Sequence, residues 1–116
     1  MAYFSFPKRK RLLNRADFVN LNRFGRRCHS EHFLVIFKEN GLGFTRLGIT
    51  ASKKTGNAVK RNRTKRLIRE FFRLNKSFLP HGYDIVVVAK RGASYCDLRK
   101  LEVEIGEIIF DQKMFT

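Results

Sequence analysis

The side chains in this sequence that are best suited to chemistry are cations. Between Lys53 and Arg73 the chain carries a dense run of Lys and Arg in which Glu70 is the single acid. A guanidinium group can bond two phosphate oxygens at once, and an amide such as Asn62 can both donate and accept. These types favour binding of a polyanion. The residues predicted to bind it are Lys53, Lys54, Asn57, Lys60, Arg61, Asn62, Arg63, Lys65, Arg66, Arg69 and Arg73.

A helix over residues 57–75 would position these cations, with Asn57 as its N-cap. At ~100° per residue, one side of this helix collects polar residues within an arc of roughly 140°: Arg61, Asn62, Lys65, Arg66, Arg69 and Arg73. Roughly opposite lie Thr64, Leu67, Ile68, Phe71 and Leu74. Like charges one turn apart repel by a few tenths of a kcal/mol, and a phosphate backbone would turn that repulsion into attraction. We therefore expect one face to pack on a core and the other to bind a ligand.

The whole chain shares this charge bias. Its 116 residues hold 25 Lys and Arg against 10 Asp and Glu, a net charge of +15. Such a charge favours nucleic acid as the partner over an anionic membrane surface. The longest unbroken apolar run, Ile85 to Ala89, is far shorter than the ~20 residues of a membrane-spanning helix. Since the two cysteines suggest no disulfide framework, a reducing cytoplasm is the expected location.

The remaining pattern predicts one domain over residues 1–116, with residues 1–13 as a basic arm that is either a frayed terminus or a flexible phosphate contact. A short helix after Asn14 would bury a stripe made of Phe18, Leu21 and Phe24. Strand formers at 32–37, a turn at 40–43 and a returning strand at 46–51 indicate a hairpin. The apolar run at 83–89 is typical of a central strand buried on both faces. The expected fold is α+β, an α/β sandwich with one mixed sheet of about four strands and three helices.

The last helix would follow a capping-box-like pair, Ser94 and Asp97. Its apolar stripe is Leu98, Leu101, Ile105, Ile108 and Ile109. Its acids, together with those beside it, indicate a solvated face: Asp97, Glu102, Glu104, Glu107 and Asp111.

Neither a metal site nor a catalytic site is predicted in this chain. Metal-ligand types occur at Cys28, His29, Glu31 and His32, but their spacing matches no standard zinc site and no second cluster completes it. Cys96 is expected to be a small residue at a helix start. The acids are scattered, whereas a protein nuclease needs paired carboxylates or a pair of His residues.

The basic segment resembles a known signature. Lys54, Ala58-Val59, Arg61-Asn62, Lys65-Arg66 and Arg69 are similar to the motif of the protein subunit of bacterial ribonuclease P. Further similarity extends from about Phe6 to Phe110, including the strands at 48–54 and 83–90.

This resemblance implies a ribosomal protein S5 domain 2-like fold with a left-handed β-α-β crossover, which sequence rules alone would not predict because nearly all crossovers are right-handed. It implies a subunit of an endoribonuclease that removes the 5′ leader of precursor tRNA. The catalytic RNA subunit would do the chemistry with bound Mg²⁺, and the protein, one copy per RNA, would bind that RNA and the leader.

The resemblance also implies a leader-binding cleft between the first helix and the sheet. Its residues would come from Phe18, Phe33, Ile36, Phe37 and Lys90. Phe18 matches an aromatic position of the family, whereas Asn22 and Ile36 stand where aromatics are expected. For Phe18, Phe33 and Phe37, a core position is the alternative.

Other functions fit the basic helix as well. The main alternative is a ribosomal or ribosome-associated protein that binds ribosomal RNA. A DNA-binding module with the helix in the major groove and a membrane-surface protein are further alternatives.

Overall fold

The computed structural model describes residues 15–111, and the basic arm and the Asn14 cap lie outside them. In chain order the helices and strands are α1 (Arg15–Phe24), β1 (Arg26–His29), β2 (Phe33–Glu39), β3 (Arg46–Ala51), α2 (Ala58–Leu74), β4 (Tyr83–Ala89) and α3 (Leu98–Ile109). Three short 3-10 turns join them, η3 (Lys53–Thr55), η4 (Lys76–Phe78) and η5 (Ala93–Tyr95). The predicted α+β fold with one mixed sheet and three helices is confirmed.

The strand order in the sheet is β1-β2-β4-β3. The predicted central position of β4 is confirmed. This strand runs antiparallel to β2 and parallel to β3. The predicted hairpin between residues 32–37 and 46–51 is wrong, because β3 pairs with β4 and not with β2. Asn40 shows why: its backbone N–H donates to Gly82 O and its side chain to Asp84 Oδ1, so the chain leaves β2 across the start of β4.

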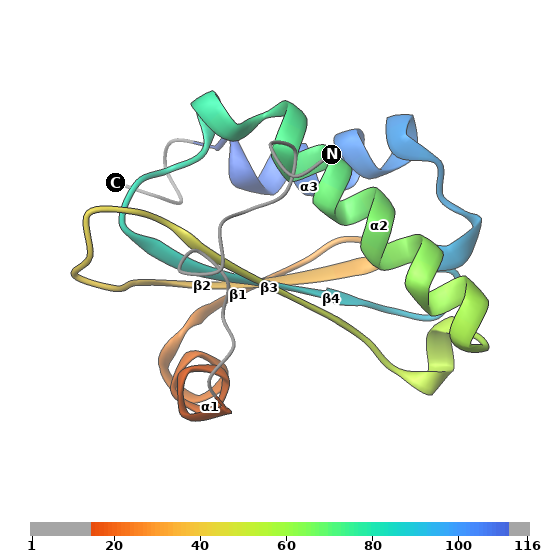
Figure 1. The fold of residues 1–116 in the computed structure, drawn as a ribbon, viewed down its shortest axis with the longest axis horizontal. Helices are drawn as coiled ribbons and strands as arrows, with labels where there is room; N and C mark the ends of the chain where they lie inside the picture. Colours follow the sequence, from red (N-terminus) through yellow and green to blue (C-terminus); the bar gives the residue numbers. More distant parts are fainter. Residues whose placement is uncertain (1–14, 112–116) are drawn as a thin grey trace.

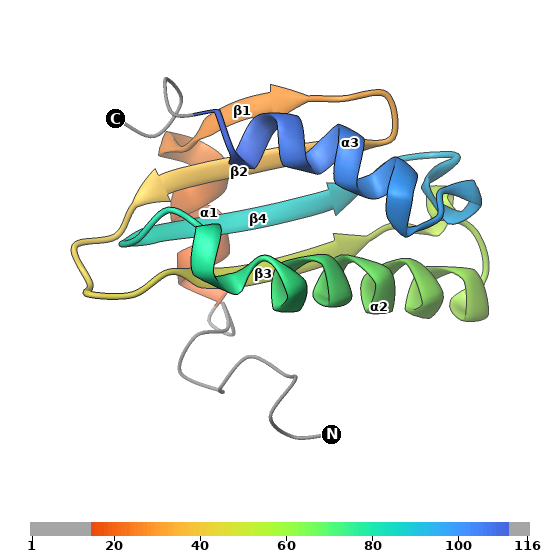
Figure 2. The ribbon, with the colours of Figure 1, turned by 90° about the horizontal axis from the view of Figure 1, so that it is seen from above.

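The connection from β3 through α2 to β4 has the hand that the resemblance implied. Figure 2 views the sheet from the side of α2 and α3, with β3 and β4 both pointing to the right and β4 above β3. In this view α2 lies in front of the sheet. A chain that runs from β3 through a helix in front of the sheet to a parallel strand above β3 makes a left-handed crossover. Right-handed connections dominate such units, so this turn of the chain is an uncommon feature.

Helices cover both faces of the sheet. α2 and α3 lie on one face and α1 lies on the other (Figure 1). Successive side chains of β2 point to opposite faces. Phe33, Val35 and Phe37 join the large core under α2 and α3, while Leu34 and Ile36 pack with Leu21 of α1.

Predictions for each of the three helices need correction. Phe24 and Leu74 are 63% and 49% exposed, so neither belongs to a buried stripe, and Phe72, which the projection left out, is 1% exposed. In α3, Asp97 is itself the N-cap and accepts from Lys100 N, whereas Ser94 lies in η5. No helix within residues 15–111 is long and apolar enough to cross a membrane.

Candidate nucleic-acid interface

The basic surface is built on a helix that its own sequence starts and anchors. Asn57 accepts a hydrogen bond from Lys60 N at 3.0 Å, which caps the first turn of α2 as predicted. Gly56 before it has φ 141°, and a Cβ there would lie 2.8 Å from Lys60 Cδ, so glycine is required for this approach. Thr64, Ile68 and Phe71 are buried against the sheet and α3. The opposite side of the helix is thereby left to solvent.

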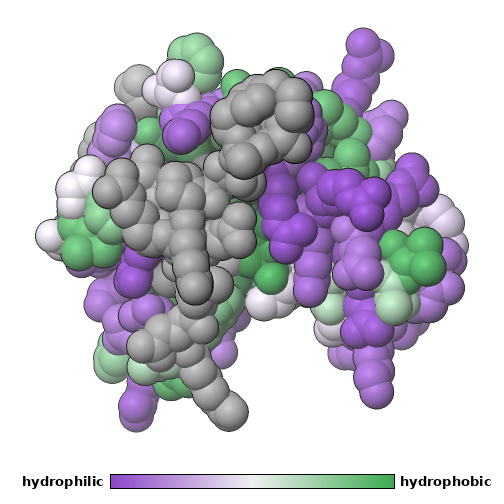
Figure 3. Space-filling model, viewed as in Figure 1, coloured by the Kyte–Doolittle hydropathy of each residue, from purple (hydrophilic) through white to green (hydrophobic). Residues whose placement is uncertain are grey.

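The predicted RNA-binding residues all lie on η3, at the N-cap of α2 or on α2, as one surface that we call the α2 surface. Most of its side chains are exposed, while Arg61, Lys65 and Arg73 are half-buried. Hydrophilic side chains gather over α2 on the right of the face in Figure 3. Within residues 15–111, no Lys or Arg of this surface other than Arg73 forms an ion pair with an acid. The surface therefore presents cations without internal neutralisation.

Arg73 is the exception. Its guanidinium donates to Glu70 through Nε at 3.0 Å and through a second, shorter contact from Nη2. This hydrogen bonding lowers the pKa of Glu70 and keeps its carboxylate charged. The single acid of the basic segment thus neutralises the last cation of the helix.

We expect Arg73→Ala to weaken RNA binding less than Arg66→Ala does, because Arg66 is exposed and has no described acid partner. Each substitution removes one positive charge, so the two variants change the net charge equally. They differ in the phosphate contact that is lost, which we expect at Arg66 but not at Arg73, whose guanidinium is bound to Glu70. Filter binding across a salt series should show the slope falling by about one unit for Arg66→Ala. An equal fall for Arg73→Ala would contradict this ranking.

Arg61 occupies a particular position on the α2 surface. Its Nε is buried and has no hydrogen-bond partner in the described part of the chain. A buried donor of a charged group gains free energy from any acceptor that reaches it. The half-buried guanidinium is therefore suited to a phosphate or base oxygen supplied by a ligand.

A cavity of about 290 Å³ lies on the opposite face, between α1 and the sheet. It is lined by Phe18, Val19, Leu21, Asn22, Ile36, Thr50, Val86 and Val88. An ion pair of 3.2 Å between Arg46 and Asp17 ties α1 to β3, and Arg46 also bonds Asp84 at the start of β4. The cavity is thus a groove with mainly apolar walls and fixed sides.

The structure brings only part of the predicted leader-binding set together. Phe18 and Ile36 line the cavity. Phe33 and Phe37 are 0% exposed in the core beneath α2 and α3, so the core alternative holds and their assignment to the cleft is corrected. Lys90 is not among the residues that line the cavity; its ammonium donates to Ser30 O at 2.9 Å.

A cluster of titratable side chains that the sequence analysis did not predict lies at the start of β2. His32, Cys96 and Glu104 come together although His32 and Glu104 are 72 residues apart. Glu104 is 7% exposed, so its assignment to a solvated face is wrong. Four donors surround its carboxylate. Burial raises the pKa of Glu104, but the hydrogen bonds from His32 and Ser30 together outweigh it, so the pKa is lowered. Burial, followed by the charge of Glu104, raises the pKa of the Cys96 thiol to about 11.

Comparison with known proteins decides the family. The sequence model of the family described as Ribonuclease P matches residues 6–112.

The chain belongs to the ribonuclease P protein family.

Relatives and solved structures agree with this membership. The chain is 43% identical to the "Ribonuclease P protein component" of Geotalea uraniireducens over 94% of its own length and 96% of that protein. The Thermotoga maritima protein of the same name is 44% identical over 78% of this chain and 77% of its own. The Staphylococcus aureus RNase P protein structure superposes with a TM-score of 0.81 at 33% identity, covering 92% of this chain and 98% of that one. The family that the α2 motif indicated is therefore confirmed.

Proposed function

We propose that this chain binds the RNA subunit of ribonuclease P through the α2 surface and the 5′ leader of precursor tRNA through the α1 cavity. The holoenzyme would then cut the leader to give the mature tRNA 5′ end. The observation that carries the proposal is a helix face of cations that, apart from Arg73, have no described acid partners. Such a face gains both contacts and counterion-release entropy from an RNA backbone.

The cavity suits a single-stranded segment better than a duplex. Its walls are mainly apolar, and Phe18 contributes a half-buried ring to its lining. Unpaired bases can stack on such rings, whereas bases in a duplex are already stacked. Asn22 on the same helix adds an amide donor for a base edge or sugar, while its Oδ1 accepts from Arg27 Nη2.

We place the bond-breaking chemistry and its Mg²⁺ ions on the RNA subunit. The one carboxylate on the α2 surface, Glu70, is held by Arg73, so the surface does not fit a Mg²⁺ site, which needs oxygen ligands. The residues of this chain would instead orient RNA and screen its charge. One protein per RNA and a cytoplasmic location remain predictions from the sequence.

Reconstitution tests this function directly. The purified chain, added to a ribonuclease P RNA at low Mg²⁺, should restore cleavage of precursor tRNA at the mature 5′ end, because its cations replace part of the screening that Mg²⁺ supplies. Cleavage by the protein alone would contradict our placement of the chemistry. Co-purification with ribosomal RNA in place of the ribonuclease P RNA would favour the ribosomal alternative.

Phe18→Ala should weaken binding of leader-bearing precursor tRNA while leaving mature tRNA unchanged. A lost stacking contact is worth ~1–3 kcal/mol per base. Fluorescence binding to both RNAs measures the difference. Phe18→Leu keeps apolar bulk against the sheet but removes the ring, and Phe24→Ala removes an exposed ring of the same helix outside the cavity. An equal loss for both RNAs would return Phe18 to a purely structural role.

A further inference from the structure

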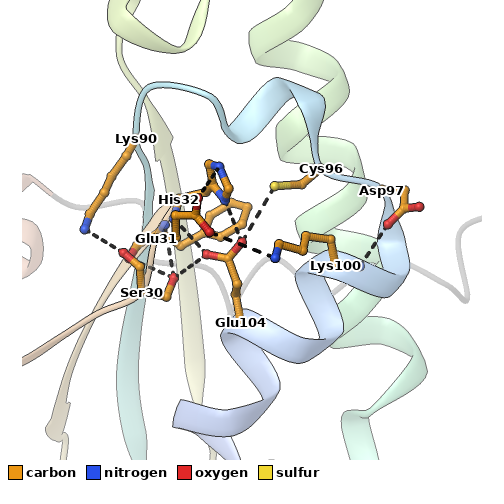
Figure 4. Close-up of polar contacts among 9 residues, drawn as sticks. Ser30, Glu31, His32, Lys90, Cys96, Asp97, Lys100 and Glu104 are labelled. Carbon is orange, nitrogen blue, oxygen red and sulfur yellow. Dashed lines mark hydrogen bonds and ion pairs between the residues drawn. The ribbon is translucent and has the colours of Figure 1, made fainter.

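The cluster of His32, Cys96 and Glu104 plays no part in the function proposed above. His32 precedes β2, Cys96 precedes α3 and Glu104 lies within α3. Their side chains point toward one another between the sheet and α3 (Figure 4), with one ligand atom from each within 4.8 Å of the others. Cys96 and Glu104 are 4% and 7% exposed, while the His32 side chain is 20% exposed. A nitrogen, a sulfur and an oxygen donor thus converge at a site with one side open to solvent.

We propose that His32, Cys96 and Glu104 bind a divalent transition metal ion of the zinc class. Imidazole, thiolate and carboxylate are the ligands that Zn²⁺ takes in proteins, and three of them with a water complete a tetrahedral site. The set also excludes Mg²⁺ and Ca²⁺ as preferred ions, since both favour oxygen ligands alone.

Two of the three ligand-to-ligand distances need adjustments of less than 1 Å, and the third, between His32 and Cys96, is at most 4.8 Å. Bond lengths of ~2.0–2.3 Å in a tetrahedral site place ligand atoms roughly 3.3–3.6 Å apart. Cys96 Sγ lies 3.8 Å from Glu104 Oε2, close to that range. His32 Nδ1 lies 2.7 Å from the same oxygen, a hydrogen bond that must open by less than 1 Å. Gly92 leaves room for the ring, because a Cβ there would lie 3.0 Å from His32 Cδ2.

The two oxygens of Glu104 have separate partners. Oε1 accepts from Ser30 Oγ at 2.8 Å and from His32 N at 2.7 Å. Oε2 faces His32 Nδ1 and Cys96 Sγ. Outer hydrogen bonds of this kind orient a ligating carboxylate and leave its other oxygen to the ion.

Charge and protons also balance. Binding releases the Cys96 thiol proton to solvent and moves the imidazole proton of His32 from Nδ1 to Nε2, where Glu31 Oε1 lies 3.8 Å away. A divalent ion with one thiolate, one carboxylate and a neutral imidazole has no net charge, which suits a mostly buried site. The facing cations are already engaged: Lys90 donates to Ser30 O, and Lys100 pairs with Glu31. The cost is deprotonation of a thiol with a raised pKa.

Cobalt titration of the untagged full chain, freed of RNA and metal, tests the site. We expect one equivalent of Co²⁺ to produce a sulfur-to-metal charge-transfer band in the near ultraviolet, and Zn²⁺ to remove it by displacement. Cys96→Ser should abolish the band, whereas Cys28→Ser, which alters the chain's other cysteine, should keep it. His32→Gln should weaken Co²⁺ binding at least tenfold, and it serves as the second variant if Cys96→Ser fails to fold.

Three outcomes would overturn the proposal. They are absence of the band with the native chain, persistence of the band in folded Cys96→Ser, and loss of the band in folded Cys28→Ser. In each case the cluster would be a hydrogen-bonded clamp between the start of β2 and α3 and not a metal site. None of these outcomes bears on RNA binding by the α2 surface.

Discussion

Replacing Arg66 and Arg69 together with alanine should weaken binding of the ribonuclease P RNA about thirtyfold near physiological salt. Both side chains are exposed and neither has a described acid partner. Each phosphate contact contributes about 0.9 to the slope of log affinity against log salt. Losing two contacts should therefore flatten that slope by roughly two units, and binding measured from low to high salt would report both the loss and the slope.

A charge-matched control separates contact from net charge. Arg23→Ala with Arg99→Ala removes the same two charges from exposed positions on α1 and α3. This double variant should change the slope by less than one unit. Neither pair should alter stability by more than ~0.5 kcal/mol, as is usual for exposed residues. A control that weakens binding as strongly as the α2 variant would mean that the RNA senses total charge and not the α2 surface.

Phe71→Ala should cost about 3–5 kcal/mol of unfolding free energy. The Phe71 side chain is 1% exposed and contacts the ring of Phe72 edge-on at 5.2 Å and that of Phe110 at 6.0 Å. It lies in the core that joins α2 and α3 to the sheet. Domains of this size have about 5–15 kcal/mol in total, so urea unfolding should show a large loss and RNA binding should fall with it.

Phe78→Ala is the matched control for this prediction. Phe78 is 74% exposed just beyond α2, so its removal creates no cavity and should leave the midpoint of unfolding nearly unchanged. A loss in Phe71→Ala no larger than that in Phe78→Ala would show that the packing of α2 contributes little to stability.

The sequence predictions that the structure confirms rest on patterns among residues close together in the chain. The α2 helix was predictable because Asn57 caps it, Ile68 and Phe71 recur at helical spacing, and the cations share one side. The central position of β4 followed from an apolar run without polar alternation. The motif within α2 was also specific enough to indicate the family.

Long-range partners were beyond the reach of such patterns. β1 has few strand-forming residues and is a strand because it pairs with β2. β3 was predicted as the second strand of a hairpin because it follows a turn, but it pairs with β4. The handedness of the crossover came only from the resemblance. In β2 both faces are buried, so no polar residue marked which rings, Phe33 and Phe37 or others, belong to the core and which side chains line the cavity. The pairing of His32 with Glu104 required the fold itself.

The alternation of β4 has a consequence for how this protein can change. Val86 and Val88 line the cavity, whereas the alternate residues Ile85 and Val87 lie in the core that packs against α2. Substitutions at 86 and 88 can therefore reshape the groove while the helix-bearing side keeps its packing. Natural variation or protein design can therefore change the cavity-facing side of β4 without changing the side that packs against α2.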